Sequence, residues 1–365
     1  MAHTTAPASY KSLLHQMTQT TATCLWNDSA AIDELTRSIA DGAVGATCNP
    51  VIALAVVKAD LATWTPRIRA LIDELPAATE NQIAGKVVEE LSIRAAALLE
   101  PAFQADRGRN GRLSIQTDPQ LFRDTAALIA QAEHFHQLAA NMIVKIPATR
   151  AGIAAIEECT YRGISINATV SFTLAQCIAV AEAVERGLSR REREGKDIAT
   201  MGPVCTLMVG RLDDWLKVVA DREAITVEPG ALEWAGVAVF KKAYQLYRAR
   251  GYRLRLLSAA FRNHLHWSEL VGGDVVISPP YAWQARLNQS GVAVAPRIDQ
   301  PVAPHIVGQL HGRFGDFRRA YDQDALPIAE FDSFAPTRRT LRQFLAASRE
   351  LDAVIRDIMV PDPDK

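Results

Sequence analysis

The 365-residue sequence has no excess of either charge, because 40 lysines and arginines balance 41 aspartates and glutamates. It therefore has no extended basic field that would attract nucleic acid or an anionic membrane surface. No apolar run reaches the roughly 18 residues of a membrane span, and residues 1–20 lack the charged start and long apolar centre of a signal peptide. These absences predict a cytoplasmic protein whose partner is a small molecule.

Cysteine is scarce and scattered. The five cysteines are odd in number and lie far apart in apolar segments, at Cys24, Cys48, Cys159, Cys177 and Cys205. This pattern favours reduced, packed side chains over a disulfide framework or a zinc site. His264 and His266 could form a metal pair, but no acidic third ligand stands at a suitable spacing, so we expect packed or solvated loop histidines and no metal.

A glycine-rich phosphate loop is also missing, since no GxGxxG follows the first strand-like run, and this argues against a doubly wound open sheet. Eight short apolar runs have the character of strands, and they begin at Thr21, Gly42, Arg112, Met142, Ile164, Gly202, Arg255 and Asp274. Amphipathic helical patterns separate most of them. Strand and helix alternating eight times predicts a closed α/β barrel, the (β/α)8 TIM barrel, with an outer ring of helices.

Two segments of the sequence add residues that a minimal barrel does not need. Several helices, instead of one, are predicted between Pro50 and Arg112, and a C-terminal extension over residues 296–365 ends in a helical pattern from Ala335. Neither segment has strands of its own, so we expect a single domain over residues 1–365. Residues 1–18 are expected to form a helical or flexible lead, and the SRREREGKD run from Ser189 a solvated helix end.

The stretch NMIVKIPATRAGIAA from Asn141 places one lysine, Lys145, inside an apolar strand. A lysine is rarely buried without a partner, because removing an ammonium from water costs several kcal/mol. The side chain could snorkel to solvent. Alternatively, burial depresses its pKa and frees a neutral amine for Schiff-base chemistry.

The other strands test these alternatives, because the active site of such a barrel lies at the C-terminal ends of its strands. Polar residues in phase with the interior are Asp28, Thr47, Asn49, Ser114, Gln116, Asp118, Asn167, Thr169, Thr206, Arg211 and Arg262. Taken singly, Asp28 could cap a helix, Asn49 could be a turn residue and Arg211 could pair with Asp213 or Asp214. Together they predict carbonyl chemistry on an anionic substrate, with Lys145 as nucleophile, Asp28 as proton carrier across the cavity, and Arg211 and Arg262 binding phosphate.

Five motifs in this order resemble those of the transaldolase family. GATCNP at Gly45 resembles the family's GATTNPS segment, and VKIPAT at Val144 resembles its Schiff-base strand. INATVSFTLAQ at Ile166 resembles its INVTLIFSLAQ segment. VGRLDDW at Val209 is similar to VGRILDW, and SAAFRN at Ser258 is similar to GASFRN. The match spans nearly the whole barrel. The inserted helices and the TRRTLRQF segment are similar to the longer members of the family.

The resemblance implies a transferase of the pentose phosphate pathway that needs no cofactor. It would move a dihydroxyacetone unit from sedoheptulose 7-phosphate or fructose 6-phosphate to glyceraldehyde 3-phosphate or erythrose 4-phosphate. Lys145 would form the Schiff base and Asp28 would carry the proton. The other implied residues place the substrate and the catalytic water or hold the phosphate: Gln116, Thr169, Thr47, Asn49, Asn167, Arg211 and Arg262. We expect sugar phosphates as partners, no nucleic acid or membrane, and a monomer or a homodimer.

Three positions depart from the family pattern. Gln116 stands where transaldolases have glutamate, Met208 where they have phenylalanine, and Ala260 where they have serine. Related fructose 6-phosphate aldolases carry glutamine at the first position, but they pair it with a tyrosine near Met208. The sequence therefore leaves two alternatives open: a lyase on the same fold that releases free dihydroxyacetone, and a non-catalytic barrel that binds sugar phosphates.

Overall fold

Eight parallel strands close into one barrel in the computed structural model, which describes residues 10–364. Each strand pairs with the next in the chain, and β8 pairs with β1. The strands are β1 (Cys24–Asn27), β2 (Ala43–Cys48), β3 (Arg112–Gln116), β4 (Met142–Pro147), β5 (Ile166–Ser171), β6 (Val204–Leu207), β7 (Arg255–Ala259) and β8 (Val276–Ser278). The predicted barrel is confirmed, and each strand lies within or beside its predicted apolar run.

Helices surround the barrel as the alternating pattern predicts. The helices of the ring are α2 (Ile32–Ala40), α6 (Thr125–His136), α7 (Arg150–Arg162), α8 (Leu174–Arg193), α9 (Val209–Glu223), α10 (Ala235–Arg250), α11 (Leu265–Ser268) and α12 (Tyr281–Asn288). Short 3-10 turns, Pro119–Leu121 and Ala231–Trp234, precede α6 and α10. No helix within residues 10–364 is both long and apolar enough to cross a membrane.

The barrel interior is filled below its C-terminal end. Trp26, Ile143, Val204, Leu257, Ala259 and Val276 form a separate buried cluster inside the ring of strands. The indole of Trp26 lies against Gly45, where an added Cβ would come 2.4 Å from the ring. The glycine of the GATCNP motif is therefore required by the packing of Trp26, which forms the floor beneath the candidate site.

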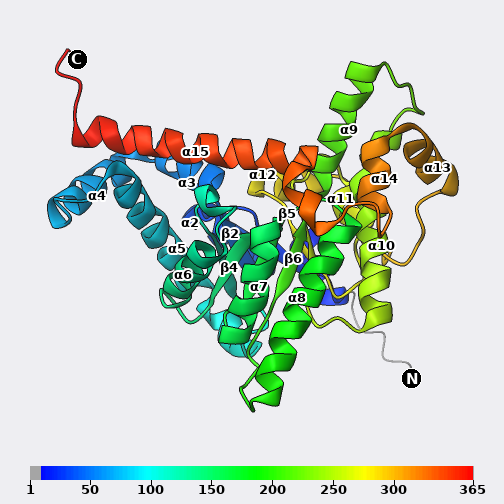
Figure 1. Ribbon diagram of the computed structural model, residues 1–365, viewed down its shortest axis with the longest axis horizontal. Coiled ribbons are helices and arrows are strands. Elements are labelled where there is room, and N and C mark those ends of the chain that lie inside the picture. The colour runs from blue at the N-terminus through cyan, green and yellow to red at the C-terminus, as the bar shows by residue number, and fades with distance from the viewer. Residues whose placement is uncertain (1–9, 365) are drawn as a thin grey trace, which may run out of the picture.

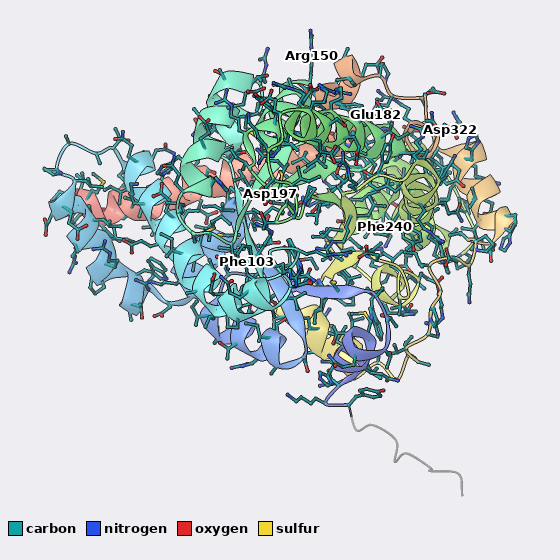
Figure 2. All side chains as sticks on the ribbon, turned by 90° about the horizontal axis from the view of Figure 1, so that it is seen from below. Phe103, Arg150, Glu182, Asp197, Phe240 and Asp322 are labelled. Carbon is teal, nitrogen blue, oxygen red and sulfur yellow. The ribbon has the colours of Figure 1, made fainter. Side chains whose placement is uncertain are left out.

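The N-terminal end of the barrel is closed by arginines whose N–H groups have acceptors. Arg112 is buried, donates to the carbonyl oxygens of Gly108 and Met142 at 2.6 and 3.2 Å, and lies 5.0 Å from the ring centre of Phe103. Phe103 is labelled in the view from below (Figure 2). Arg255 donates to the carbonyl oxygen of Arg109 at 3.0 Å. These partners are mainly backbone carbonyls, so we assign this end a structural function.

The two additions to the barrel lie together. Helices α3 (Pro50–Ala59), α4 (Leu61–Glu74) and α5 (Glu80–Ala105) follow β2, and the C-terminal extension holds α13 (Pro304–Arg313), α14 (Gly315–Tyr321), a 3-10 segment (Ile328–Ser333) and α15 (Ala335–Met359). Helix α15 contacts α3, α4 and α5, and Figure 1 shows it running across them along one side of the molecule. The extra helices predicted in both segments are confirmed.

Helix α1 (Leu13–Thr20) forms part of the predicted N-terminal lead, whose residues 1–9 lie outside the described residues. Helix α8 ends at Arg193, and most residues of the charged run from Ser189 to Asp197 are at least partly exposed, as predicted. The assignment of residues 1–365 to one domain stays a prediction.

Candidate active site

Lys145 lies in the barrel wall and does not snorkel to solvent. Its side chain is 3% exposed, and in the strand register it pairs with Gln116 on β3 and Asn167 on β5. Among residues 10–364, no hydrogen bond or ion pair engages its ammonium. Burial lowers the pKa of Lys145, and the positive charge of Arg211 lowers it further, while Asp28 opposes both. The amine is therefore biased towards its neutral, nucleophilic form.

Lys241 is also a buried lysine, but its ammonium has hydrogen-bond partners. It is also 3% exposed, but its Nζ donates to Glu269 at 2.7 Å and to the carbonyl oxygens of Arg297 and Gln300 at 3.0 and 2.9 Å. A charged partner and two acceptors keep that ammonium satisfied. Lys145, by contrast, has no such partner among the described residues.

Asp28 follows β1 at the mouth of the barrel. Burial raises the pKa of this carboxyl, and the charges of Lys145, Arg211 and Arg262 oppose the rise. No ion pair within 4.0 Å joins Asp28 to Lys145, so within the described chain the two groups act on each other across the cavity. Asp28 does not cap the following helix, because α2 begins after Ala31 with no side-chain cap.

Asn167 is held from both sides inside the barrel. Its amide nitrogen donates to Ser114 Oγ at 2.8 Å, and its carbonyl oxygen accepts a hydrogen bond from Thr206 Oγ1 at 2.7 Å. The network joins β3, β5 and β6 and fixes the orientation of the amide next to Lys145. Ser114 and Thr206, both buried, thus hold the amide of Asn167 in place.

Two polar atoms near Lys145 are buried without a partner among the described residues: Gln116 Oε1 and Thr169 Oγ1. Both residues point to the interior side of their strands, and Gln116 is the strand neighbour of Lys145. A buried polar atom without a hydrogen bond costs free energy, about 1–3 kcal/mol. Both atoms are therefore available to bind a substrate hydroxyl or a water molecule.

Thr47 and Asn49 lie at the end of β2. Thr47 is buried opposite Ser114. Asn49 caps α3, because its Oδ1 accepts hydrogen bonds from the backbone of Val51 and Ile52 at 2.9 and 3.0 Å. The sequence suggested a turn residue at Asn49, and the structure makes it the N-cap of α3, which also fixes the direction of its amide nitrogen.

Arg211 opens α9 and faces the C-terminal helix. Its guanidinium donates to Gln343 and, at 3.5 Å, to Thr340 Oγ1, and lies 5.6 Å from the ring centre of Phe344. Its Nε is buried without a partner. Burial and the nearby charge of Arg262 lower the pKa of Arg211 to about 10. An anion bound between the two arginines would relieve this repulsion.

Arg262 follows β7 and pairs with Asp214, at 2.9 Å from both Nε and Nη2 to the carboxylate. The alternative in which Arg211 pairs with Asp213 or Asp214 is therefore not observed. Asp213 instead pairs with buried His266, at 2.8 Å between Oδ2 and Nε2. The backbone N–H of Arg262 donates to His266 Nδ1 at 3.1 Å, so Nε2 carries the proton and donates to Asp213.

This Asp213–His266 pair supports the turn that carries Arg262. The sequence predicts His266 only as a packed or solvated loop residue, and the packed alternative is correct, because its side chain is fully buried. Its spacing of four residues from Arg262 could have pointed to this contact. Within residues 10–364, no group of three or more His, Cys, Asp or Glu side chains is arranged to hold a metal ion.

Two strand ends at the site adopt left-handed backbone conformations. Val170 has φ = 53° directly after Thr169, and Ala260 has φ = 64° two residues before Arg262. Such a conformation costs of the order of 1–3 kcal/mol for residues other than glycine, and most for a β-branched one such as valine. The positive φ at both positions indicates that tertiary structure, rather than local propensity, sets the backbone there.

The fold and this geometry define a (β/α)8 barrel with a buried lysine that has no partner within residues 10–364, and with two arginines at the C-terminal ends of its strands. The family model described as Transaldolase/Fructose-6-phosphate aldolase matches residues 25–310, and the chain belongs to this family. Transaldolase 1 of Streptomyces coelicolor is 32% identical over 291 residues, which cover 70% of this chain and 71% of the relative. The transaldolase of Thiobacillus denitrificans is 29% identical over 359 residues, which cover 88% and 96%. The resemblance seen in the motifs is confirmed.

Proposed function

We propose that this protein is a transaldolase that carries a dihydroxyacetone unit on Lys145 between a ketose phosphate and an aldose phosphate. The observation that carries the proposal is the environment of Lys145: an amine buried in a strand, without a hydrogen bond to other described residues, and with a lowered pKa. Family membership supports the same reaction. The lysine supplies the electron sink itself, so the scheme needs neither a metal nor an organic cofactor.

The first stage forms the imine. The neutral amine of Lys145 attacks the C2 carbonyl of the ketose, and the carbinolamine loses water to give a protonated imine. Proton transfers to and from the carbinolamine oxygen require a water molecule or an acid near the lysine. We assign the placement of that water to Gln116 and Thr169, whose buried oxygen atoms have no partner among the described residues.

The second stage breaks and remakes a carbon–carbon bond. The C3–C4 electron pair moves into the imine and forms an enamine, while the C4 hydroxyl gives its proton to Asp28 and the aldehyde leaves. The enamine then attacks the carbonyl carbon of a second aldose, and Asp28 returns the proton to the new hydroxyl. The raised pKa of Asp28 suits this double use as base and acid. Hydrolysis of the imine releases the new ketose.

The substrate is held at both ends in this scheme. Arg211 and Arg262 bind the phosphate, and Asn167, Thr47 and Asn49 place the dihydroxyacetone unit near Lys145 on the other side of the barrel mouth. Support comes from the free Nε of Arg211 and the mutual repulsion of the two arginines. Sedoheptulose 7-phosphate or fructose 6-phosphate as donor, and glyceraldehyde 3-phosphate or erythrose 4-phosphate as acceptor, would place the reaction in the pentose phosphate pathway. The cytoplasmic location and the monomeric or dimeric state stay predictions.

A second candidate is cleavage without transfer, as in fructose 6-phosphate aldolases. Gln116 favours it, because an amide at this position cannot take a proton from the catalytic water. Met208, which is buried at the end of β6, opposes it because the tyrosine that accompanies glutamine in those enzymes is missing. Free dihydroxyacetone formed without an acceptor would identify the lyase.

The proposal is tested by transfer from fructose 6-phosphate to erythrose 4-phosphate. Lys145→Arg keeps a positive charge but is not a nucleophile, and we expect no turnover. Lys58→Arg, a change at an exposed lysine paired with Glu350, is the matched control and should keep wild-type activity. If wild type shows neither transfer nor cleavage but binds fructose 6-phosphate, the chain is a binding barrel and the proposal fails.

A further inference from the structure

A cavity of about 700 Å³ lies beside the mouth of the barrel. It is enclosed by the turn between α4 and α5, the first half of α5, the segment after β3, and the C-terminal half of α15. These are the two additions to the minimal barrel, which lie next to one another in Figure 1. The cavity meets the barrel at Asn49 and Gln116 and reaches Asp352 on α15. Its volume is within the range of small-molecule sites.

Two buried acceptor atoms mark the cavity. Gln116 Oε1 and Asp352 Oδ1 both belong to lining residues, and neither has a hydrogen-bond partner among residues 10–364. The two side chains are 6% and 9% exposed. Unpartnered buried acceptors are rare in folded proteins. Because both atoms can accept a hydrogen bond, a complementary ligand carries donors at two separate points.

The charge of the cavity disfavours an anionic ligand. Of its acidic residues, Glu74 pairs with Arg67, and Glu89 with Lys86. Asp118 and Asp352 form no ion pair within the described chain. Burial raises the pKa of Asp352, and the charges of Glu80 and Asp118 raise it further, while a hydrogen bond with Asn81 and the charge of Arg356 oppose the rise. This excess negative charge favours an ammonium and disfavours phosphate or carboxylate.

Part of the cavity lining is apolar. The apolar lining residues include Leu75, Pro76, Ala78, Val88, Phe135 and Leu351. Such a lining favours a ligand with an apolar part. An aromatic ring would bind more favourably than other apolar groups, because it can pack against the ring of Phe135. The arrangement is unlike the sugar-phosphate site, where two arginines face the ligand.

We propose that this cavity binds an unphosphorylated aromatic amine, with its ammonium at Asp352 and Asp118 and a hydroxyl donor at Gln116 Oε1. The site is separate from the arginines at the opposite side of the barrel mouth. It touches the active site through Gln116, the strand neighbour of Lys145. A ligand there therefore contacts a residue of the reaction site without competing for the phosphate.

Four related probes test the ligand class by titration calorimetry with the full chain and no sugar. Tyramine has the ring, the hydroxyl and the ammonium. Phenethylamine lacks the hydroxyl, 4-ethylphenol lacks the ammonium, and 3-(4-hydroxyphenyl)propionate replaces it with a carboxylate. We expect tyramine to bind most tightly and the carboxylate most weakly. The proposal is overturned if no probe binds, or if the carboxylate binds as well as tyramine.

Two variants test the place of binding. Asp352→Asn should weaken tyramine binding by about tenfold or more and leave 4-ethylphenol unchanged. Gly85→Leu fills the cavity from α5, where an added Cβ meets no atom within 4 Å, so the fold should survive and tyramine binding should be lost. Gly308→Leu, on α13 and also without a contact at its Cβ, is the matched control.

Unchanged tyramine binding in Gly85→Leu would overturn the assignment even if Asp352→Asn fails to fold. Equal loss in Gly85→Leu and Gly308→Leu would do the same. These measurements use neither a ketose nor turnover, so their outcome is independent of whether Lys145 forms an imine.

Discussion

Gln116 and Lys145 lie directly opposite each other on β3 and β4, and both side chains are buried. Gln116 is thus the nearest residue on the neighbouring strand to the candidate nucleophile. Its Oε1 has no partner among the described residues. The clearest departure from the transaldolase motifs therefore occurs next to the lysine, where it bears on proton transfer rather than on the formation of the fold.

The balance between transfer and cleavage tests this position. A carboxylate can exchange a proton with the catalytic water, whereas an amide can only orient it. We expect wild type to be a slow transaldolase or to show measurable cleavage, and Gln116→Glu to raise the ratio of transfer to cleavage. The measurement compares erythrose 4-phosphate-dependent transfer with acceptor-free release of dihydroxyacetone. An unchanged ratio, or complete loss of activity, would show that the glutamine is adapted to another substrate.

The two arginines are expected to recognise phosphate. Arg211→Ala or Arg262→Ala should raise KM for fructose 6-phosphate by about tenfold or more, since a hydrogen bond to a charged group contributes about 1.5–3 kcal/mol. KM for free dihydroxyacetone should change little. Gln343→Ala is the control, because it removes one hydrogen bond between α15 and Arg211 and keeps the charge of the arginine. Equal losses with phosphorylated and free substrates would count against this assignment.

The pH dependence of imine formation should respond to the charges around Lys145. Only the neutral amine attacks, so the rate falls as pH falls through the pKa of Lys145. Arg211 lowers this pKa and Asp28 raises it. Arg211→Gln should therefore move the acid limb to higher pH, and Asp28→Asn should move it to lower pH. The readout is cyanoborohydride trapping of dihydroxyacetone, relative to wild type at each pH; shifts in the same direction for both variants would refute the electrostatic account.

Much of the fold could be predicted from local patterns. Lys145 stands alone in an apolar run, and alternation along each strand selects inward residues such as Asn167 and Thr206. A parallel strand buried on both faces leaves a strong local signal. For that reason, the order of the strands and the polar residues at their C-terminal ends could be found without coordinates.

The remaining features depend on contacts between distant parts of the chain. Arg211 meets Thr340 and Gln343, which lie 129 and 132 positions away. No local periodicity records such a contact, and the same holds for the pairing of Asp213 with His266 over 53 positions. The positive φ of Val170 runs against the preference of a β-branched residue, so tertiary structure imposes it.

The most direct test of the central claim is the mass of the protein after borohydride reduction in the presence of fructose 6-phosphate. Formation of an imine by Lys145 predicts one added reduced dihydroxyacetone unit, mapped to the peptide that contains Lys145 and absent in Lys145→Arg. The paired lysine Lys241 should stay unmodified. An adduct on Lys58 or Lys86, or no adduct on any lysine, would contradict the assignment.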